Sequence, residues 1–114
     1  MNKENMRSFS NRQERKIARQ FDGKQTANSG AGFIKGDILT RNFLIEAKTT
    51  TKEIKTFPVK EEWLKKLKQE KFAMNKRHAA LAFQFKQGGE NYFIIDERAF
   101  NDFQRLVKKE EKEG

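Results

Sequence analysis

The chain of 114 residues contains no cysteine, which excludes disulfide bonds and metal sites built on thiolates. Its one histidine, His78, follows two basic residues, so we do not expect Ser29 to act as a nucleophile activated by a histidine. No apolar run approaches the ~20 residues of a membrane-spanning helix, and no signal peptide is visible. These absences predict a cytoplasmic protein without a membrane span.

Acidic residues are fewer than basic ones, and this imbalance bears on the partner. The chain carries 25 Lys and Arg against 16 Asp and Glu, which gives a formal net charge of +9 and a pI near 9.9. A surface of this kind attracts polyanions, so we expect nucleic acid as the partner, with an anionic membrane surface as the competing interpretation. Many small basic proteins merely carry solvated lysines, so charge alone gives no more than this expectation.

Hydrophobic residues make up only 35% of the chain, but eleven phenylalanines increase the area that each core residue can bury. The length suits one domain with a modest core. There is no internal repeat and no low-complexity linker. We therefore expect residues 1–114 to form a single domain, with residues 1–7 and 108–114 flexible.

The first predicted element is a helix from Ser10 to about Phe21. Ser10 and Gln13 have the spacing of a capping box, and Ile17, Ala18 and Phe21 form its inward face. Glu14 belongs to that apolar face or borders it. The sequence Asp22-Gly23 ends the helix.

The rest of the chain alternates strand and helix signals. Pro58 suits the first turn of a second helix, whose face is marked by Val59, Trp63, Leu67 and Met74. Asp96 caps a last helix with Phe100, Phe103 and Val107 at helical spacing. The predicted strands are residues 36–40, 43–50, 79–85 and 92–95, with a mobile loop at 26–32 and a turn at Gly88-Gly89. The fold class is therefore α/β: a small mixed β-sheet flanked by helices, in the order α-β-β-α-β-β-α.

Two acids and a lysine stand on the two most apolar predicted strands. Residues two apart on a strand share a face, so Glu46 and Lys48 point the same way, while Phe43, Ile45 and Ala47 point into the packing. A three-residue hairpin connection brings Asp37 near that pair. Two converging carboxylates suit a hard cation such as Mg²⁺, and a lysine beside it can orient a water or stabilise charge on a phosphate.

Each of these residues also has an ordinary structural interpretation. Glu46 and Lys48 can be a solvated face with a weak ion pair, and Glu14 can be a helix-surface acid. His78 is interpreted as a surface residue near a helix end or as another phosphate contact. Trp63 and the phenylalanines are interpreted as core rather than as platforms for base stacking.

The pattern Asp37-x8-Glu46-Ala47-Lys48 resembles the catalytic motif of the PD-(D/E)XK nucleases, and the layout over residues 8 to 100 resembles archaeal and phage Holliday junction resolvases. Ser29-Gly30 matches a loop of that group, and Lys60 opens the following helix. Gly36 stands at the proline of the motif, and Gln25-Thr26 at an arginine often seen before the loop.

The resemblance implies a restriction-endonuclease-like fold and a magnesium-dependent endodeoxyribonuclease, a hydrolase that resolves four-way junctions in DNA recombination. It implies that Asp37 and Glu46 bind Mg²⁺, or Mn²⁺ in its place, with the backbone carbonyl of Ala47 and with Glu14 as a further acid. Lys48 would be the catalytic lysine. It also implies a homodimer with one site per cut strand, typically phage-encoded and acting in the host cytoplasm.

Alternatives remain open: a nuclease of the same type acting on nicks, flaps or linear DNA, or a basic DNA-binding module without activity. The residues expected to contact DNA are Ser29, Gly30, Lys35, Arg41, Lys52, Lys55, Lys60, Lys76 and Arg77.

Overall fold

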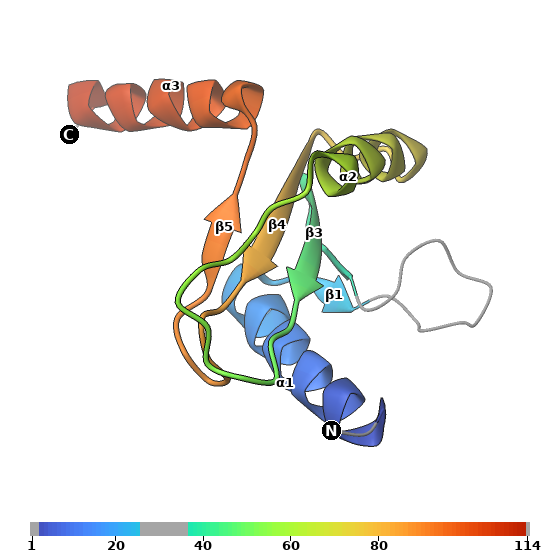
Figure 1. Ribbon diagram of the computed structural model, residues 1–114. Helices are drawn as coiled ribbons and strands as arrows, with labels where there is room; N and C mark the ends of the chain where they lie inside the picture. Colours follow the sequence, from blue (N-terminus) through green and yellow to red (C-terminus); the bar gives the residue numbers. More distant parts are fainter. Residues whose placement is uncertain (1–2, 26–36, 114) are drawn as a thin grey trace.

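The computed structural model describes residues 3–25 and 37–113, which form a small α/β domain with a five-stranded mixed sheet (Figure 1). This confirms the predicted α/β class and the mixed sheet. The elements, in chain order, are α1 (Lys3–Phe21), β1 (Lys24–Gln25), β2 (Ile38–Leu39), β3 (Phe43–Lys48), α2 (Glu61–Ala73), β4 (His78–Phe83), β5 (Tyr92–Ile94) and α3 (Glu97–Glu113).

The strands lie in the sheet in chain order, β1-β2-β3-β4-β5. Strands β3 and β4 are parallel, and every other neighbouring pair is antiparallel. Parallel neighbours need a crossover connection, and here it contains α2. The parallel pair holds the centre of the sheet, with Phe43 opposite His78 and Lys48 opposite Phe83.

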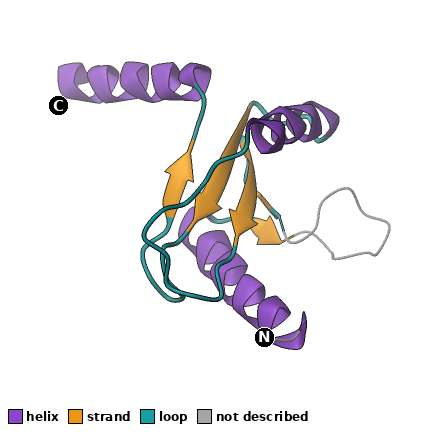
Figure 2. Ribbon diagram, viewed as in Figure 1, coloured by secondary structure: helices purple, strands orange, loops and turns teal. Residues whose placement is uncertain are grey.

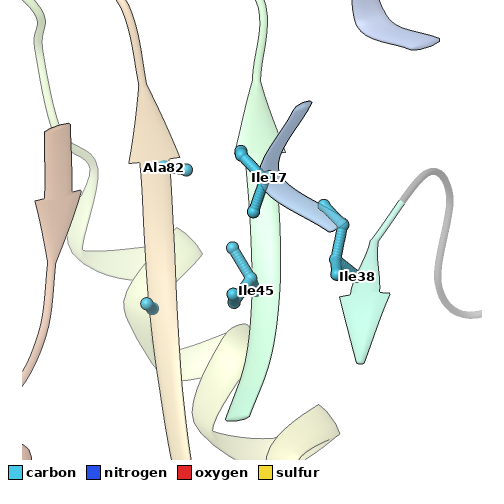
Figure 3. Packing of buried hydrophobic residues seen from close by; sticks show 5 residues of the cluster. Ile17, Ile38, Ile45 and Ala82 are labelled. Atoms are coloured by element: carbon cyan, nitrogen blue, oxygen red, sulfur yellow. The ribbon is translucent and has the colours of Figure 1, made fainter. Parts of the chain in front are cut away.

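Alternation along β3 divides the core between the two faces of the sheet. On one face, Ile45 packs with Ile17 of α1, Ile38 of β2 and Ala82 of β4 (Figure 3). On the other face, Leu44 packs with Leu67 and Leu81, with Trp63 and Phe57 at the border of the cluster. Helices α1 and α2 therefore cover opposite faces, as the period-2 pattern of β3 requires.

The end of α1 follows the prediction. Asp22 has a φ of 53°, and the amide of Gly23 donates to the carbonyl oxygen of Ala18 at 2.8 Å, so the helix closes at this pair. A Cβ at Gly23 would lie 2.6 Å from Ile38 Cγ2, so any other residue there would require the buried Ile38 to shift. Phe21, expected on the inward face, is instead 43% exposed and meets Phe93 edge to face.

Helix boundaries differ from the prediction in three places. Helix α1 begins at Lys3, so Ser10 does not start it, and the capping-box role of Gln13 is wrong. Helix α2 begins at Glu61 rather than at Pro58, and Val59 is exposed ahead of it. Helix α3 continues to Glu113, through residues that we expected to be loose. The Lys and Glu residues there have good helix propensity, but they are polar and so add nothing to the apolar pattern from which the helix was predicted.

Strand β1 is an addition to the predicted order, and the predicted strands are shorter at one or both ends. Both β1 residues are exposed, so no apolar alternation marks them in the sequence. The α3 cap is as predicted, with the amide of Ala99 donating to Asp96 Oδ1 at 2.9 Å. Figure 2 shows α3 leaving the end of β5 and projecting from the sheet. Over the described residues, no helix is long and apolar enough to cross a membrane.

Candidate active site

Strand β3 places Glu46 and Lys48 together on the face of the sheet that α2 covers. Their side chains are 25% and 30% exposed, and Lys48 Nζ lies 3.6 Å from Glu46 Oε1. Ala47, whose carbonyl is the expected backbone ligand, lies between them and packs its side chain against the α1 cluster. Both charged groups are therefore held at the border of the core rather than free in solvent.

Asp37 immediately precedes β2, and the β2–β3 register places it beside Glu46. Ile38 is opposite Ile45, so the next position outward on each strand is Asp37 and Glu46. Asp37 is only 2% exposed. Burial, followed by the nearby carboxylates of Glu46, Glu70 and Glu14, raises the pKa of Asp37 to about 8, although Lys48 opposes the shift. Asp37 therefore lies close enough to Glu46 and Lys48 for their charges to change its pKa, in agreement with the expected proximity of the three residues.

Glu14 reaches the same region from α1. It is 3% exposed, and Gln25 Nε2 donates to Glu14 Oε2 at 3.1 Å. The neighbouring Gln13 is fixed as well, because the Thr49 hydroxyl donates to its Oε1 at 2.8 Å. The expectation that Glu14 lies on the inward side of α1 is therefore confirmed, and its charge acts on Asp37.

Helix α2 places the aromatic ring of Trp63 beside Lys48. Lys48 Nζ lies 4.4 Å from the centroid of the Trp63 ring, a cation–π geometry, and Lys60 Nζ lies 5.6 Å from the same ring. Trp63 is partly buried, in accord with the core interpretation, and Phe57 connects it to Phe83 of the sheet. Its contact with the candidate catalytic lysine is not evident from the sequence.

Helix α2 also contributes Glu70, an acid that our sequence interpretation missed. Burial, followed by the charge of Glu46, raises the pKa of Glu70, while Lys66 and Lys48 oppose the shift. The signal was available, because Glu70 follows Leu67 by three residues and so lies on the face of α2 that Trp63 and Leu67 mark.

The donor set fits a small divalent cation. Asp37 and Glu46 are neighbours at a poorly solvated place, where burial and then the charges of Glu46, Glu70 and Glu14 raise the pKa of Asp37, and a cation would offset the repulsion between the carboxylates. Over residues 3–25 and 37–113, no group of three or more His, Cys, Asp or Glu side chains is placed to hold a metal ion. A cation here would be held by Asp37 and Glu46 with water around it, which is the usual manner of Mg²⁺ binding.

The predicted DNA contacts separate into two groups. Lys52 and Lys55 lie in the connection that leaves the Lys48 end of β3, and this connection meets the segment just after β4, where the amide of Ile54 donates to the carbonyl oxygen of Phe85. Lys60 lies beside Trp63. These three cations therefore share the end of the sheet where the candidate site lies. Ser29, Gly30 and Lys35 fall outside the described residues.

Arg41, Lys76 and Arg77 lie at the other end of the parallel pair. Lys76 Nζ donates to the carbonyl oxygen of Arg41 at 3.5 Å, so the two residues are neighbours. The Arg77 guanidinium lies 3.0 Å from Asp102 of α3. Since β3 separates them from Lys48, the structure does not bring them to the candidate site.

His78 corrects our prediction of a surface residue. It is the first residue of β4, it is 6% exposed, and its Nε2 lies 2.8 Å from Asp102 Oδ2. Loss of solvent alone would raise the pKa of Asp102, but hydrogen bonds and charge from Arg77 and then His78 hold it below its ordinary value. This cluster therefore fixes α3 to β4, and a direct phosphate contact by His78 is not supported.

A basic strip on α1 was also missed by sequence interpretation. Its side chains are exposed and border a shallow surface hollow. The sequence signal is the spacing i, i+3, i+4, i+7, which places all four cations on one side of a helix. The strip consists of Arg12, Arg15, Lys16 and Arg19.

No protein-family model, curated protein or solved structure matches the chain. The geometry and chemistry of the residues therefore carry the functional argument alone.

Proposed function

We propose that the chain is a metal-dependent endodeoxyribonuclease of the PD-(D/E)XK type that cuts four-way DNA junctions. The observation that carries the proposal is the proximity of Asp37, Glu46 and Lys48, with the pKa of Asp37 raised to about 8 by burial and by neighbouring acids. Acids crowded beside a lysine are costly for a purely structural purpose, and strongly perturbed groups of this kind cluster at functional sites.

The proposed roles follow from the position of each side chain. Asp37 and Glu46 would hold Mg²⁺ or Mn²⁺ together with the carbonyl of Ala47, and the bound ion would polarise the phosphate and acidify a water. Lys48, held between Glu46 and Trp63, orients the attacking water and stabilises charge on the phosphate. Glu14, oriented by Gln25, accepts hydrogen bonds from water in the same place.

The element order supports this proposal. A helix that carries an acid precedes the Asp strand, the Glu-x-Lys strand and the crossover helix, and this layout is the one implied by the resemblance, with β1 as an addition. The net charge of +9 favours a nucleic-acid substrate. In a two-fold dimer, each copy would cut one strand of the junction.

The first test is cleavage of a labelled four-way junction and of a linear duplex with the same sequence, in Mg²⁺ and in EDTA. We expect paired cuts in the junction that require the metal and disappear in Lys48→Ala. The matched control is Lys65→Ala, because Lys65 is an exposed lysine paired with Glu61 at 2.9 Å. Equal cleavage of linear duplex would instead support the related nuclease that acts on nicks, flaps or linear DNA.

A binding module without activity is the second candidate, and one observation favours it. The described residues place no group of three or more metal-ligating side chains together. Junction binding without cleavage in Mg²⁺ or Mn²⁺, and no change in melting temperature with either metal, would establish the module and exclude the nuclease.

A further inference from the structure

Helix α3 carries an apolar stripe that its own domain leaves largely exposed. Phe100, Phe103, Leu106 and Val107 are 54%, 42%, 58% and 49% exposed, and only Ala99 of this fully described helix is buried. Their positions fall on one side of a helix. Large apolar patches of this kind mark interaction sites on soluble domains.

The first half of α3 is attached to the domain, and the second half is not. Phe103 stacks on Phe43 with centroids 6.0 Å apart, and Asp102 pairs with His78 and Arg77. The C-terminal end of α3 projects away from the sheet (Figure 1). Isolated helices shorter than about 12–15 residues are marginal in water, so packing against a partner would stabilise the projecting half.

An apolar hollow of about 440 Å³ lies beside the attached half of α3. Phe21, Phe43, Phe93 and Phe103 border it, together with side chains of β3 and β4. Helix α1 covers this face of the sheet only as far as Phe21, which explains why the hollow is left open. An apolar cavity of about 150 Å³ accepts a benzene ring, so this hollow has room for two or more large side chains.

We propose that this surface docks a second copy of the chain, with Leu106 and Val107 of each α3 inserted into the hollow of the other copy. The surface carries both a projecting apolar helix and an unfilled apolar hollow, which makes it complementary to itself, as a two-fold interface requires. Each copy contributes both parts, so the contact is made twice.

Charge favours the second copy over a foreign polyanionic partner. Helix α3 carries five basic and five acidic residues, so it is neutral within a chain of net charge +9. Two copies repel one another through most of their surface, and α3 is a place where they can approach without that repulsion. A polyanion would be attracted to the basic surface of the chain instead.

The test is the mass of the full chain in solution, measured by sedimentation velocity at micromolar concentration. We expect twice the chain mass of 13.4 kDa for the wild type. Leu106→Glu should raise the dimer dissociation constant by about 100-fold, because it places a carboxylate in an apolar contact. Since Leu106 is exposed within one copy, the monomer should stay folded.

Phe72→Glu on α2 is the matched control, because Phe72 is 65% exposed and the charge change is the same. It should leave the dimer intact. A monomeric wild type, a dimer that tolerates Leu106→Glu, or equal weakening by Phe72→Glu would overturn the proposal.

A second experiment tests the arrangement within the dimer and uses the absence of cysteine. A mixture of Leu106→Cys and Phe93→Cys chains should form the mixed disulfide under mild oxidation, because Leu106 lies over the hollow of the other copy. A dimer without this cross-link would exclude the proposed insertion. Neither result depends on nuclease activity, so a dimer that fails to cut DNA would support this interface and count against the proposed function alone.

Discussion

The ammonium group of Lys48 lies 4.4 Å from the centroid of the Trp63 ring and 3.6 Å from Glu46 Oε1. The lysine is therefore held from two sides, by an acid on its own strand and by an aromatic ring on α2. Phe57 lies tilted against Trp63 and stacks on Phe83 with centroids 4.3 Å apart, so the ring is itself connected to the sheet. The position of the candidate catalytic amine thus depends on the docking of α2 as well as on β3.

The first prediction concerns Trp63 as a positioning residue. Trp63→Leu removes the ring face that holds the Lys48 ammonium, so kcat for junction cleavage should fall by about 10- to 100-fold with little change in KM. Trp63→Phe keeps an aromatic face and should retain most of the activity. Equal losses in both variants would mean that Trp63 matters only for packing. Because Trp63 is the only tryptophan, a shift of the emission spectrum in Lys48→Gln would report the contact independently.

The second prediction concerns pH and the stability of the metal-free protein. The pKa of Asp37 is about 8 in the folded chain against an ordinary value of 3.8, so the folded state binds the proton more tightly. The protonated carboxyl therefore contributes stability below about pH 4 that is lost as the pH rises towards 8. Asp37→Asn cannot ionise, so its stability relative to wild type should increase over this range, by at most about 1.4 kcal/mol per pH unit.

Urea denaturation in EDTA at several pH values between 4 and 8 measures this difference. Asp22→Asn is the control, because Asp22 is exposed and asparagine tolerates its left-handed backbone. In Mg²⁺ at pH 8 the wild type should recover stability and Asp37→Asn should not. A pH-independent difference between Asp37→Asn and wild type would show that Asp37 titrates as an ordinary carboxyl.

Local patterns predicted the centre of the site, and long-range contacts decided the rest. The period-2 alternation of β3 places Glu46 and Lys48 on one face, and the short connection to β2 brings Asp37 beside them. Both relations depend on residues fewer than a dozen apart. For the same reason, the end of α1 at Gly23 and the Asp96 cap of α3 were readable from single residues.

The missed features depend on how separate elements meet. His78 follows two basic residues in the sequence, yet it is buried because Asp102 of α3 packs against the start of β4. Glu70 is close to the site because α2 turns that face toward the sheet. The spacing of Glu70 from Leu67 indicates this orientation, but the many lysines of the helix make the face hard to recognise in the sequence. Strand β1 pairs through its backbone alone, so its two exposed side chains carry no signal.

A third prediction follows from Glu70. Its charge contributes to the raised pKa of Asp37, after burial and Glu46. Glu70→Gln removes that charge, so Asp37 should lose its proton at lower pH, and the acidic limb of the cleavage rate against pH should move to lower pH. The control is Glu62→Gln, an exposed acid near the start of the same helix, which should leave the profile unchanged. A profile that stays in place in Glu70→Gln would separate Glu70 from the titrating site.

The last prediction distinguishes the basic strip of α1 from the cations at the far end of the sheet. The exposed side chains of Arg15 and Arg19 are available for phosphate contacts, whereas the Arg77 guanidinium is engaged by Asp102 at 3.0 Å. Each lost phosphate contact lowers the slope of log affinity against log salt by about 0.9 on duplex DNA. The double variant Arg15→Ala/Arg19→Ala should therefore lower the slope by about 2, to a similar extent for unrelated DNA sequences.

Arg77→Ala should change the slope much less. Arg77 is paired with Asp102, so its removal breaks that ion pair and does not remove a phosphate contact. Affinities measured by fluorescence anisotropy over a series of salt concentrations give both slopes. A large effect of Arg77→Ala with none from the α1 pair would place the DNA at the other end of the sheet. That result would also weigh against the proposed site, because DNA bound at the start of β3 and β4 would lie a strand's length from Lys48.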